Sequence, residues 1–216
     1  MLERYRAIQA EVGPRSGRLV AVSKGQPFDK IAELYRAGHR DFGENYVQEM
    51  AEKAALAASA GLVGIRWHFL WHLQTNKVKQ LLGHVFMIHS VDSRRLAEEI
   101  SKRAMAAGLK VPVLIEVNVD AQESKSGVAP EGLGTLITEI ASLPGIEIRG
   151  LMCIPSREGG LTGEAFRYLR ALRDEYQTRL GPGELSMGMS EDYPVALREG
   201  ATWVRVGTAL FGPRNT

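Results

Sequence analysis

The chain has 216 residues, of which 44% are hydrophobic and 24% charged, a composition typical of a globular protein with a substantial core. The formal net charge is +2 and no dense basic run is present, so neither nucleic acid nor a membrane surface is an expected partner. The single cysteine, Cys153, excludes an intrachain disulfide. Because the N-terminal segment also lacks an apolar targeting stretch, we expect a cytoplasmic protein.

Short apolar runs recur along the chain, each followed by a turn and by a segment with helical periodicity. The runs span residues 19–23, 39–42, 65–70, 85–91, 113–119, 146–154, 185–189 and 203–210. Helices are predicted over residues 92–108 and 163–181, because apolar side chains recur there every three or four residues and a glycine ends each segment. The pattern therefore alternates strands with helices.

Alternating strands and helices predict a parallel sheet, whose strands are buried on both faces. The run VPVLIEVNV fits such a strand, since it is apolar almost without interruption. About eight units are present, the number that closes a (β/α)8 TIM barrel, and we expect residues 1–216 to form one such domain without a second one. An open doubly wound sheet is the alternative, but it usually has fewer strands and a G-x-G-x-x-G first turn, whereas this chain has SKGQP.

The predicted strand ends are much richer in reactive side chains than the strand starts. In a TIM barrel the carboxyl ends of the strands meet at one mouth, where functional sites lie. These ends carry Lys24, Glu44 with Asn45, His72 with Gln74, His89 with Ser90, Asn118, Cys153, Ser190, and Gly207 with Thr208. The asymmetry predicts a site at the mouth.

The last two strand ends are suited to bind an anion. The seventh strand runs into Ser190 and a helix that begins near Asp192, and the eighth runs into Gly207 and Thr208. Glycine lets the backbone approach an anion, while hydroxyl groups and free amides at a helix start donate hydrogen bonds to it. Loops at this place in TIM barrels often bind phosphate. The alternative is that Ser190 is only a helix cap and Gly207 only a turn residue.

Lys24 is an ammonium group at the end of an apolar strand, which is rare unless the lysine is paired, reactive or simply at the surface. A desolvated lysine forms a Schiff base with an aldehyde. A lysine beside a phosphate site therefore indicates pyridoxal 5'-phosphate (PLP). Arg205 would face an unprotonated pyridine nitrogen of that cofactor, or else form an ion pair with a carboxylate such as Glu116.

Seven segments together resemble the pyridoxal phosphate homeostasis protein family, whose fold is similar to the barrel domain of alanine racemase. They are VAVSK, DFGENYVQE, WHFLWHLQTNK, IHSVDS, SKSGV, RGLMCIP and LSMGMSEDYPVALREGATWVRVGTALFG. The resemblance implies that Lys24 carries the Schiff base and that Arg205 faces the ring nitrogen. It also implies that the phosphate and the rest of the cofactor are contacted by Ser190, Gly207, Thr208, Asn45 and Met152. Trp71 is a departure, since similar proteins usually have glycine there. The indole reshapes the mouth or covers the cofactor ring, or else it packs against a neighbouring helix.

Other candidate sites are weaker. His68 and His72 lack the glutamate of an H-E-x-x-H motif and lie in a predicted strand, so no metal site is expected. Cys153 has no assignable histidine and acid partners and is interpreted as a buried thiol. Residues 124–127 are interpreted as a mouth loop rather than an anion site. The strand-borne acids near the mouth, Asp41, Glu44 and Glu116, are expected to pair with arginine or lysine.

An arginine opposite the ring nitrogen disfavours carbanion chemistry, because it stays protonated and leaves the ring a weak electron sink. Racemisation also needs a second base facing Lys24, and Tyr46, Tyr168 and Tyr193 are its candidates. We therefore expect a PLP-binding protein that buffers or delivers the cofactor, as a monomer or weak dimer, with apo forms of PLP-dependent enzymes as recipients. The alternatives are a PLP-dependent amino-acid racemase and a Schiff-base aldolase acting on a phosphorylated sugar.

Overall fold

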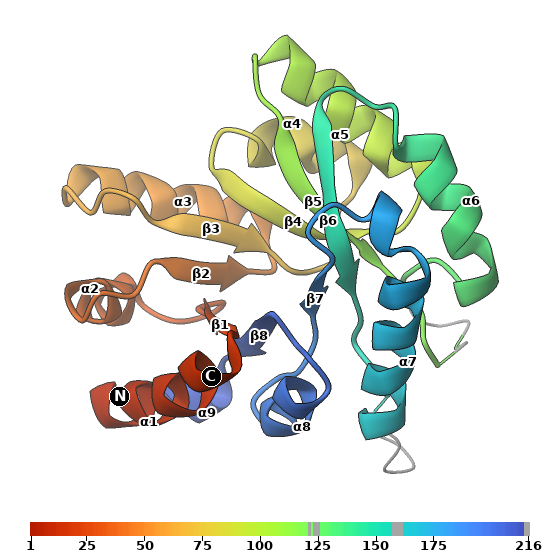
Figure 1. Cartoon of the computed structure of the whole chain (residues 1–216). Helices are drawn as coiled ribbons and strands as arrows, with labels where there is room; N and C mark the ends of the chain where they lie inside the picture. The colour runs from red at the N-terminus through yellow and green to blue at the C-terminus, as the bar shows by residue number, and fades with distance from the viewer. Residues whose placement is uncertain (121, 123–125, 157–161, 214–216) are drawn as a thin grey trace.

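The computed structural model describes residues 1–120, 122, 126–156 and 162–213. Within these residues, parallel strands form a closed barrel in chain order, so the predicted TIM barrel is confirmed (Figure 1). The strands are β1 (Arg18–Val22), β2 (Asp41–Glu44), β3 (Arg66–Phe69), β4 (Val85–Val91), β5 (Val111–Glu116), β6 (Ile146–Met152), β7 (Glu184–Ser186) and β8 (Trp203–Val206).

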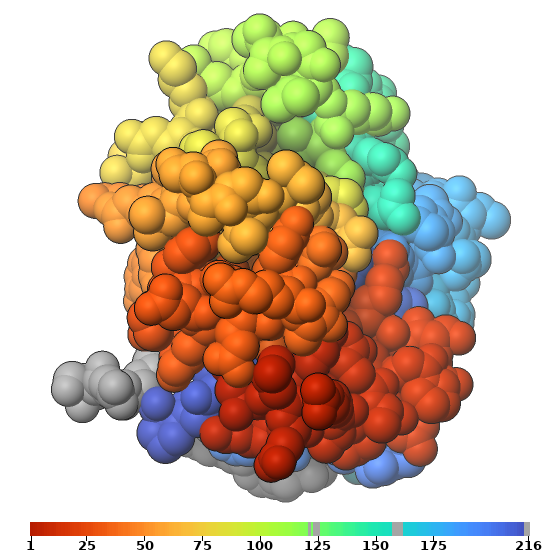
Figure 2. All heavy atoms as spheres, turned by 90° about the vertical axis from the view of Figure 1, so that its left-hand side faces the viewer, coloured from red at the N-terminus to blue at the C-terminus, as the bar shows by residue number. Residues whose placement is uncertain are grey.

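Helices surround the barrel and bury one apolar face each against it. They are α1 (Leu2–Val12), α2 (Phe28–Arg36), α3 (Val47–Ser59), α4 (Val78–Leu81), α5 (Arg94–Ala106), α6 (Pro130–Ile140), α7 (Thr162–Glu175), α8 (Tyr193–Arg198) and α9 (Thr208–Phe211). In Figure 2, α1, α2 and α3 (red to orange) cover one side of the molecule. Across the described ranges, the helices are all too short or too polar to cross a membrane.

Most predicted elements differ from the observed ones by a few residues at their ends, and three of them illustrate why. The strand predicted over residues 203–210 ends at Val206, because the backbone leaves the extended conformation at Gly207 and then forms α9. The helix predicted over residues 163–181 ends at Glu175 and is followed by a separate 3₁₀ turn. The strand predicted from residue 39 begins at Asp41. Apolar periodicity locates these elements but does not mark the residue at which the backbone changes direction.

The barrel interior is filled by side chains, as in other TIM barrels, and is not an open channel. A compact cluster of buried side chains from different strands and strand ends comprises Val20, Leu70, Met87, Leu114, Met152 and Trp203. A larger apolar cluster between the strands and the helices forms the rest of the core. The packed interior gives the mouth of the barrel a solid floor.

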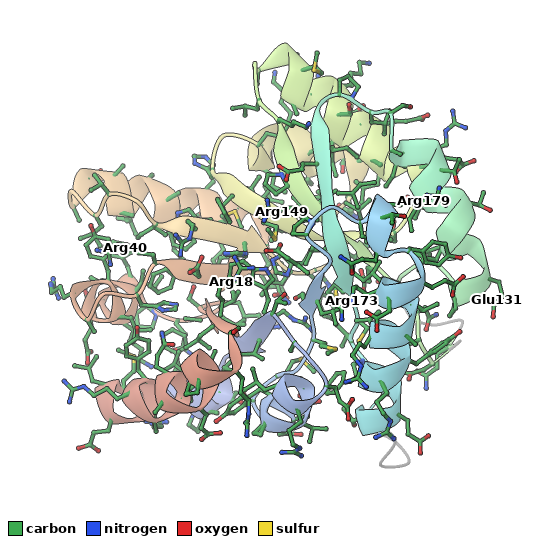
Figure 3. All side chains as sticks on the ribbon, viewed as in Figure 1. Arg18, Arg40, Glu131, Arg149, Arg173 and Arg179 are labelled. Carbon is green, nitrogen blue, oxygen red and sulfur yellow. The ribbon has the colours of Figure 1, made fainter. Side chains whose placement is uncertain are left out.

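Ion pairs close the barrel at the amino ends of the strands. Glu184 is buried at the start of β7 and pairs with Arg18 of β1 and with Arg149 of β6, whose Nε lies 3.1 Å from the carboxylate. The Arg18 guanidinium also stacks on the indole of Trp203, 3.7 Å from its centroid. In Figure 3, Arg18 and Arg149 lie near the barrel axis, whereas the other labelled side chains lie toward the outside. The site must therefore open at the opposite end.

Candidate functional site

A cavity of about 170 Å³ opens at the carboxyl ends of the strands. Its lining residues come from the segments that follow β1, β2, β3, β6 and β7 and from β8 and its end. They are Val22, Lys24, Asn45, Leu70, Trp71, Ile154, Met189, Ser190, Arg205, Gly207 and Thr208. Six of the seven residues predicted to contact the cofactor line this one cavity. The seventh, Met152, is fully buried in the interior cluster and does not line the cavity.

Lys24 lies in a tight turn directly after β1. The turn needs Gly25, whose φ is +67°, and the amide of Gly25 donates a 2.6 Å hydrogen bond to the Glu49 carboxylate on α3. The Lys24 side chain is half-buried, and its Nζ lies 5.5 Å from the centroid of the Trp71 indole. That distance is within the range of a cation–π contact. Trp71 therefore lies at the mouth beside the lysine, and its side chain is half exposed there.

A second lysine, Lys53 of α3, holds this turn from below and was missed by the sequence analysis. Its buried Nζ donates to the backbone carbonyl of Ser23 (2.6 Å), to Glu44 (2.8 Å) and to Glu49 (2.7 Å). The Ser23 hydroxyl donates to the same Glu44 oxygen at 2.6 Å. The spacing of Glu49 and Lys53, four residues apart on one helix, was the available signal. Both neighbours of Lys24 are thus anchored to α3.

The predicted anion-binding segments line the cavity next to the Lys24 turn, because β8 pairs with β1 in the closed barrel. The Ser190 hydroxyl oxygen accepts hydrogen bonds of 3.2 Å from the amides of Gly207 and Ala209. The hydroxyl thereby occupies a position where backbone N–H groups converge, and Thr208 lines the cavity beside it. A phosphate oxygen is suited to such a place, because amide and hydroxyl donors both favour negative charge.

The loop that carries Ser190 depends on the conformation of Gly188. Its φ is +89°, and an added Cβ would lie 2.5 Å from the Cβ of Ala196 and 2.9 Å from the Cα of Tyr193. The Asp192 carboxylate then accepts a 2.6 Å hydrogen bond from the amide of Met189, just before α8 begins. The predicted start of a helix near Asp192 is confirmed.

Arg205 extends from β8 into the floor of the cavity and is 4% exposed. Its Nη1 donates to the Ser186 hydroxyl at 2.7 Å, and its Nη2 donates to the carbonyl of Cys153 at 2.9 Å. Arg205 and Glu116 are both among the described residues, and no ion pair joins them. The alternative that Arg205 forms an ion pair with Glu116 is therefore wrong. Burial lowers the pKa of Arg205, and the carboxylates of Glu116 and Asp192 oppose the shift. Arginine nevertheless remains protonated.

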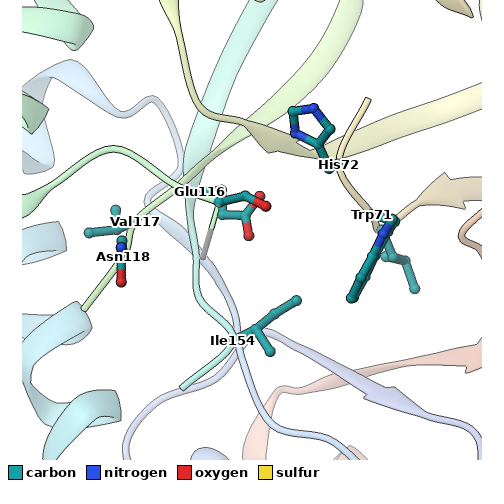
Figure 4. A pocket seen from close by; sticks show the side chains of 8 residues that line it. Trp71, His72, Glu116, Val117, Asn118 and Ile154 are labelled. Carbon is teal, nitrogen blue, oxygen red and sulfur yellow. The ribbon is translucent and has the colours of Figure 1, made fainter. Parts of the chain in front are cut away.

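A second pocket adjoins the cavity behind Trp71 and Ile154 (Figure 4). The Glu116 carboxyl points into it and is 6% exposed, while His72 lies at its rim and pairs with Asp92 at 3.3 Å. Burial raises the pKa of Glu116 to about 7, with the nearby Asp92 charge adding to the effect. Among the described residues no arginine or lysine forms an ion pair with Glu116, so the pairing expected for it is not observed.

The other strand-borne acids pair as predicted. Asp41 forms a bidentate pair with Arg66, and Glu44 pairs with Lys53 at 2.8 Å. Asp41, however, lies at the start of β2, at the end of the barrel remote from the mouth, which corrects its predicted position. Cys153 is fully buried, and burial raises the pKa of its thiol to about 12, which fits an unreactive side chain.

The remaining candidates lie apart from the cavity. Tyr46 is 62% exposed and Tyr168 43% exposed, Tyr193 is buried, and none of the three lines the Lys24 cavity. Within the described ranges, histidine, cysteine and acidic side chains form no group of three suited to a metal ion. Residues 124 and 125 of the predicted mouth loop over residues 124–127 lie outside the described residues, and Ser126 lines the pocket that contains Glu116.

Comparison with known proteins first assigns this barrel to the class of alanine racemase N-terminal domains. A family model described as the N-terminal domain of alanine racemase matches residues 1–215. Alanine racemase from Corynebacterium glutamicum is 17% identical, with a TM-score of 0.71 over 99% of this chain and 61% of that chain, which is a likeness of fold alone.

Nearer relatives identify the group within that class. The pyridoxal phosphate homeostasis protein of Aquifex aeolicus is 45% identical over 207 residues, covering 94% of this chain and 90% of that protein. PipY of Synechococcus elongatus has been solved without PLP (39% identity, TM-score 0.91) and with PLP bound (38%, 0.88). Both structures match 97% of this chain and 99% of their own. The chain therefore belongs to the pyridoxal phosphate homeostasis protein family.

Proposed function

We propose that this protein binds PLP in the Lys24 cavity, as a Schiff base on Lys24, and takes part in PLP homeostasis by buffering or delivering the cofactor. One observation carries the proposal: Lys24, the Ser190 and Gly207 segments, and Arg205 line a single cavity. The relative PipY, solved with PLP bound, supports the same ligand for this chain. In this proposal residues 1–216 are one PLP-binding domain.

Each lining residue has a chemical role in this proposal. Ser190, Gly207 and Thr208 hold the phosphate, and Arg205 donates a hydrogen bond to the pyridine nitrogen. The buried residue Asn45 also lines the cavity and in this proposal orients the ring. Met152 contributes from beneath, as part of the packed interior that supports the cavity floor.

The same residues favour binding over catalysis. A protonated arginine can only donate a hydrogen bond, so it stabilises the unprotonated form of the pyridine nitrogen. The neutral ring then withdraws electrons weakly. The titratable side chains that line the cavity are Lys24 and Arg205, and Arg205 cannot serve as a base. The cofactor itself supplies the aldehyde chemistry, while the chain binds and orients it.

An amino-acid racemase is the second candidate, and Glu116 favours it. Its carboxyl lies in the pocket that adjoins the cavity, and a pKa raised to about 7 suits a group that exchanges protons at neutral pH. Exchange of the amino-acid α-hydrogen for solvent deuterium at enzyme-like rates, abolished by Glu116→Gln, would establish this activity. Exchange that is absent or equally slow in both proteins is the result we expect.

Titration of the apo-protein with PLP tests the main proposal. Binding should produce a yellow absorbing species, and borohydride followed by peptide mass spectrometry should locate the cofactor on Lys24. Lys24→Ala should lose the covalent adduct yet retain part of the affinity, and Arg205→Gln should weaken binding about tenfold or more. The exposed Lys79→Ala serves as the control and should match the wild type. A colourless protein with unmodified Lys24 at saturating PLP would reject the proposal.

Delivery requires a recipient, for which we propose apo forms of PLP-dependent enzymes in the cytoplasm. In the presence of a phosphatase that destroys free PLP, the loaded protein should restore activity to such an apo-enzyme faster than an equal concentration of free PLP. Equal rates would leave buffering as the function and reject direct transfer. Monomeric or weakly dimeric behaviour, as expected from the sequence, is measured in the same preparation by sedimentation.

A further inference from the structure

A line of hydrogen-bonded polar side chains crosses the apolar interior from Arg205 to the far end of the barrel. Arg205 Nη1 lies 2.7 Å from Ser186 Oγ, and Ser186 Oγ lies 2.8 Å from His89 Nδ1. His89 Nε2 lies 2.9 Å from His68 Nδ1, and His68 Nε2 lies 3.0 Å from Asp41 Oδ1. The other four residues of the line are all buried, and both histidines are completely buried.

The chemistry of the two ends determines where every proton in this line lies. Asp41 accepts two hydrogen bonds from Arg66. These bonds and the one from His68 outweigh burial and hold the pKa of Asp41 well below its usual range. The carboxylate can only accept, so His68 must carry its proton on Nε2. Burial lowers the pKa of His68 against the attraction of Asp41, which leaves His68 neutral with Nδ1 free to accept.

Each remaining proton in the line is fixed by the partner that precedes it. His68 Nδ1 accepts, so His89 must donate from Nε2, and burial also keeps His89 neutral. His89 Nδ1 then accepts the hydroxyl proton of Ser186, whose oxygen accepts from Arg205. Every hydrogen bond points the same way, from the guanidinium to the carboxylate. Bonds aligned in this manner polarise one another and strengthen the whole series.

We propose that Ser186, His89, His68 and Asp41 are positioning residues that hold Arg205 in one orientation, as a permanent hydrogen-bond donor to the cofactor's ring nitrogen. The line gives the buried cation a carboxylate partner at a distance, in place of a direct ion pair that would block its N–H groups. The guanidinium is thereby stabilised while its remaining donors stay available to the cavity. This assignment rests on the proposed PLP function for its ligand, but the hydrogen-bond line itself is a property of the apo-protein.

The first test needs no cofactor. Ring-nitrogen NMR spectra of histidine-labelled apo-protein distinguish the two neutral tautomers of each imidazole. His68 and His89 should both be neutral and protonated on Nε2 at neutral pH. A proton on Nδ1 of either ring, or a doubly protonated ring, would overturn the proposal whether or not the protein binds PLP.

The second test compares two serine variants. Ser186→Ala removes the link to Arg205. Ser90→Ala makes the same change one residue after His89, at a buried hydroxyl that has no hydrogen-bond partner among the described residues. Ser186→Ala should weaken PLP binding about tenfold and shift the absorption band of the bound cofactor. Ser90→Ala should change neither.

The spectrum separates a positioning role from a merely structural one. A variant that only loosens the fold lowers the melting temperature, but its bound cofactor keeps the wild-type absorption band. Ser186→Thr, which retains a hydroxyl, should restore the band and most of the affinity. If Ser186→Ala matches Ser90→Ala in both affinity and spectrum, the line does not position Arg205. If the wild type fails to bind PLP, the proposed function is rejected and the NMR result alone decides on the line.

Discussion

Replacing Lys53 with methionine tests how the Lys24 turn is held. Methionine keeps much of the apolar stem but removes the ammonium that bonds to the Ser23 carbonyl and to two carboxylates. Breaking a buried ion pair usually costs about 3–5 kcal/mol, because the remaining charge is left uncompensated. Glu44 can avoid much of this cost by taking up a proton, since burial raises its pKa to about 7 even with Lys53 present.

The destabilisation should therefore depend on pH. The folded-state pKa of Glu44 lies above its ordinary value of 4.5, so stability from this group is lost as the pH rises between the two values. In Lys53→Met the pKa of Glu44 rises further, because the attractive charge is gone. We expect a loss of about 2 kcal/mol near pH 6, from the Ser23 carbonyl and the other lost hydrogen bonds. Above pH 7 the difference from wild type should grow by about 1.4 kcal/mol per pH unit.

Urea unfolding followed by circular dichroism at several pH values measures this difference. The control repeats the Lys53→Met change in a Glu44→Gln background. Neither of those two proteins carries the Glu44 carboxyl, so the difference in stability between them should not grow as the pH rises above 7. PLP affinity should also fall in the single variant, since Ser23 precedes Lys24. A loss of stability that is the same at pH 6 and at pH 8.5 would refute the assignment of Glu44 as the uncompensated charge.

Three further substitutions test separate features. Burial lowers the pKa of His39 to about 4, so the neutral imidazole contributes stability that is lost as the pH falls from 6.5 to 4. The loss is about 3 kcal/mol in all. His39→Gln should reduce this dependence of the unfolding free energy on pH, as measured by urea titrations. Gly188→Ala should cost about 2–4 kcal/mol in thermal unfolding, against less than about 0.5 for Gly83→Ala, where an added Cβ meets nothing. Trp71→Ala should speed PLP release about two- to fivefold in stopped-flow measurements, and Tyr168→Ala should not. An unchanged pH dependence in His39→Gln, an unchanged stability in Gly188→Ala or an unchanged release rate in Trp71→Ala would each contradict the role given to that residue.

Much of the fold follows from local patterns in the sequence. Apolar runs that alternate with amphipathic segments identify the strands and helices, and their number indicates a closed barrel. The polar strand ends locate the mouth, because parallel strands all present their carboxyl ends on one side. Lys24, Ser190 and Gly207 are therefore found from sequence, and the structure brings them into one cavity.

The tertiary structure alone decided which buried polar groups meet. Asp41, His68, His89, Ser186 and Arg205 lie on five different strands, and local periodicity does not encode the register that aligns them. The positions of His89 and Asp41 in the sequence predict that both lie at or near the mouth, whereas His89 lies in the core and Asp41 at the far end of the barrel. Burial and hydrogen-bond geometry depend on contacts between residues distant in the chain, so they exist only once the barrel has closed.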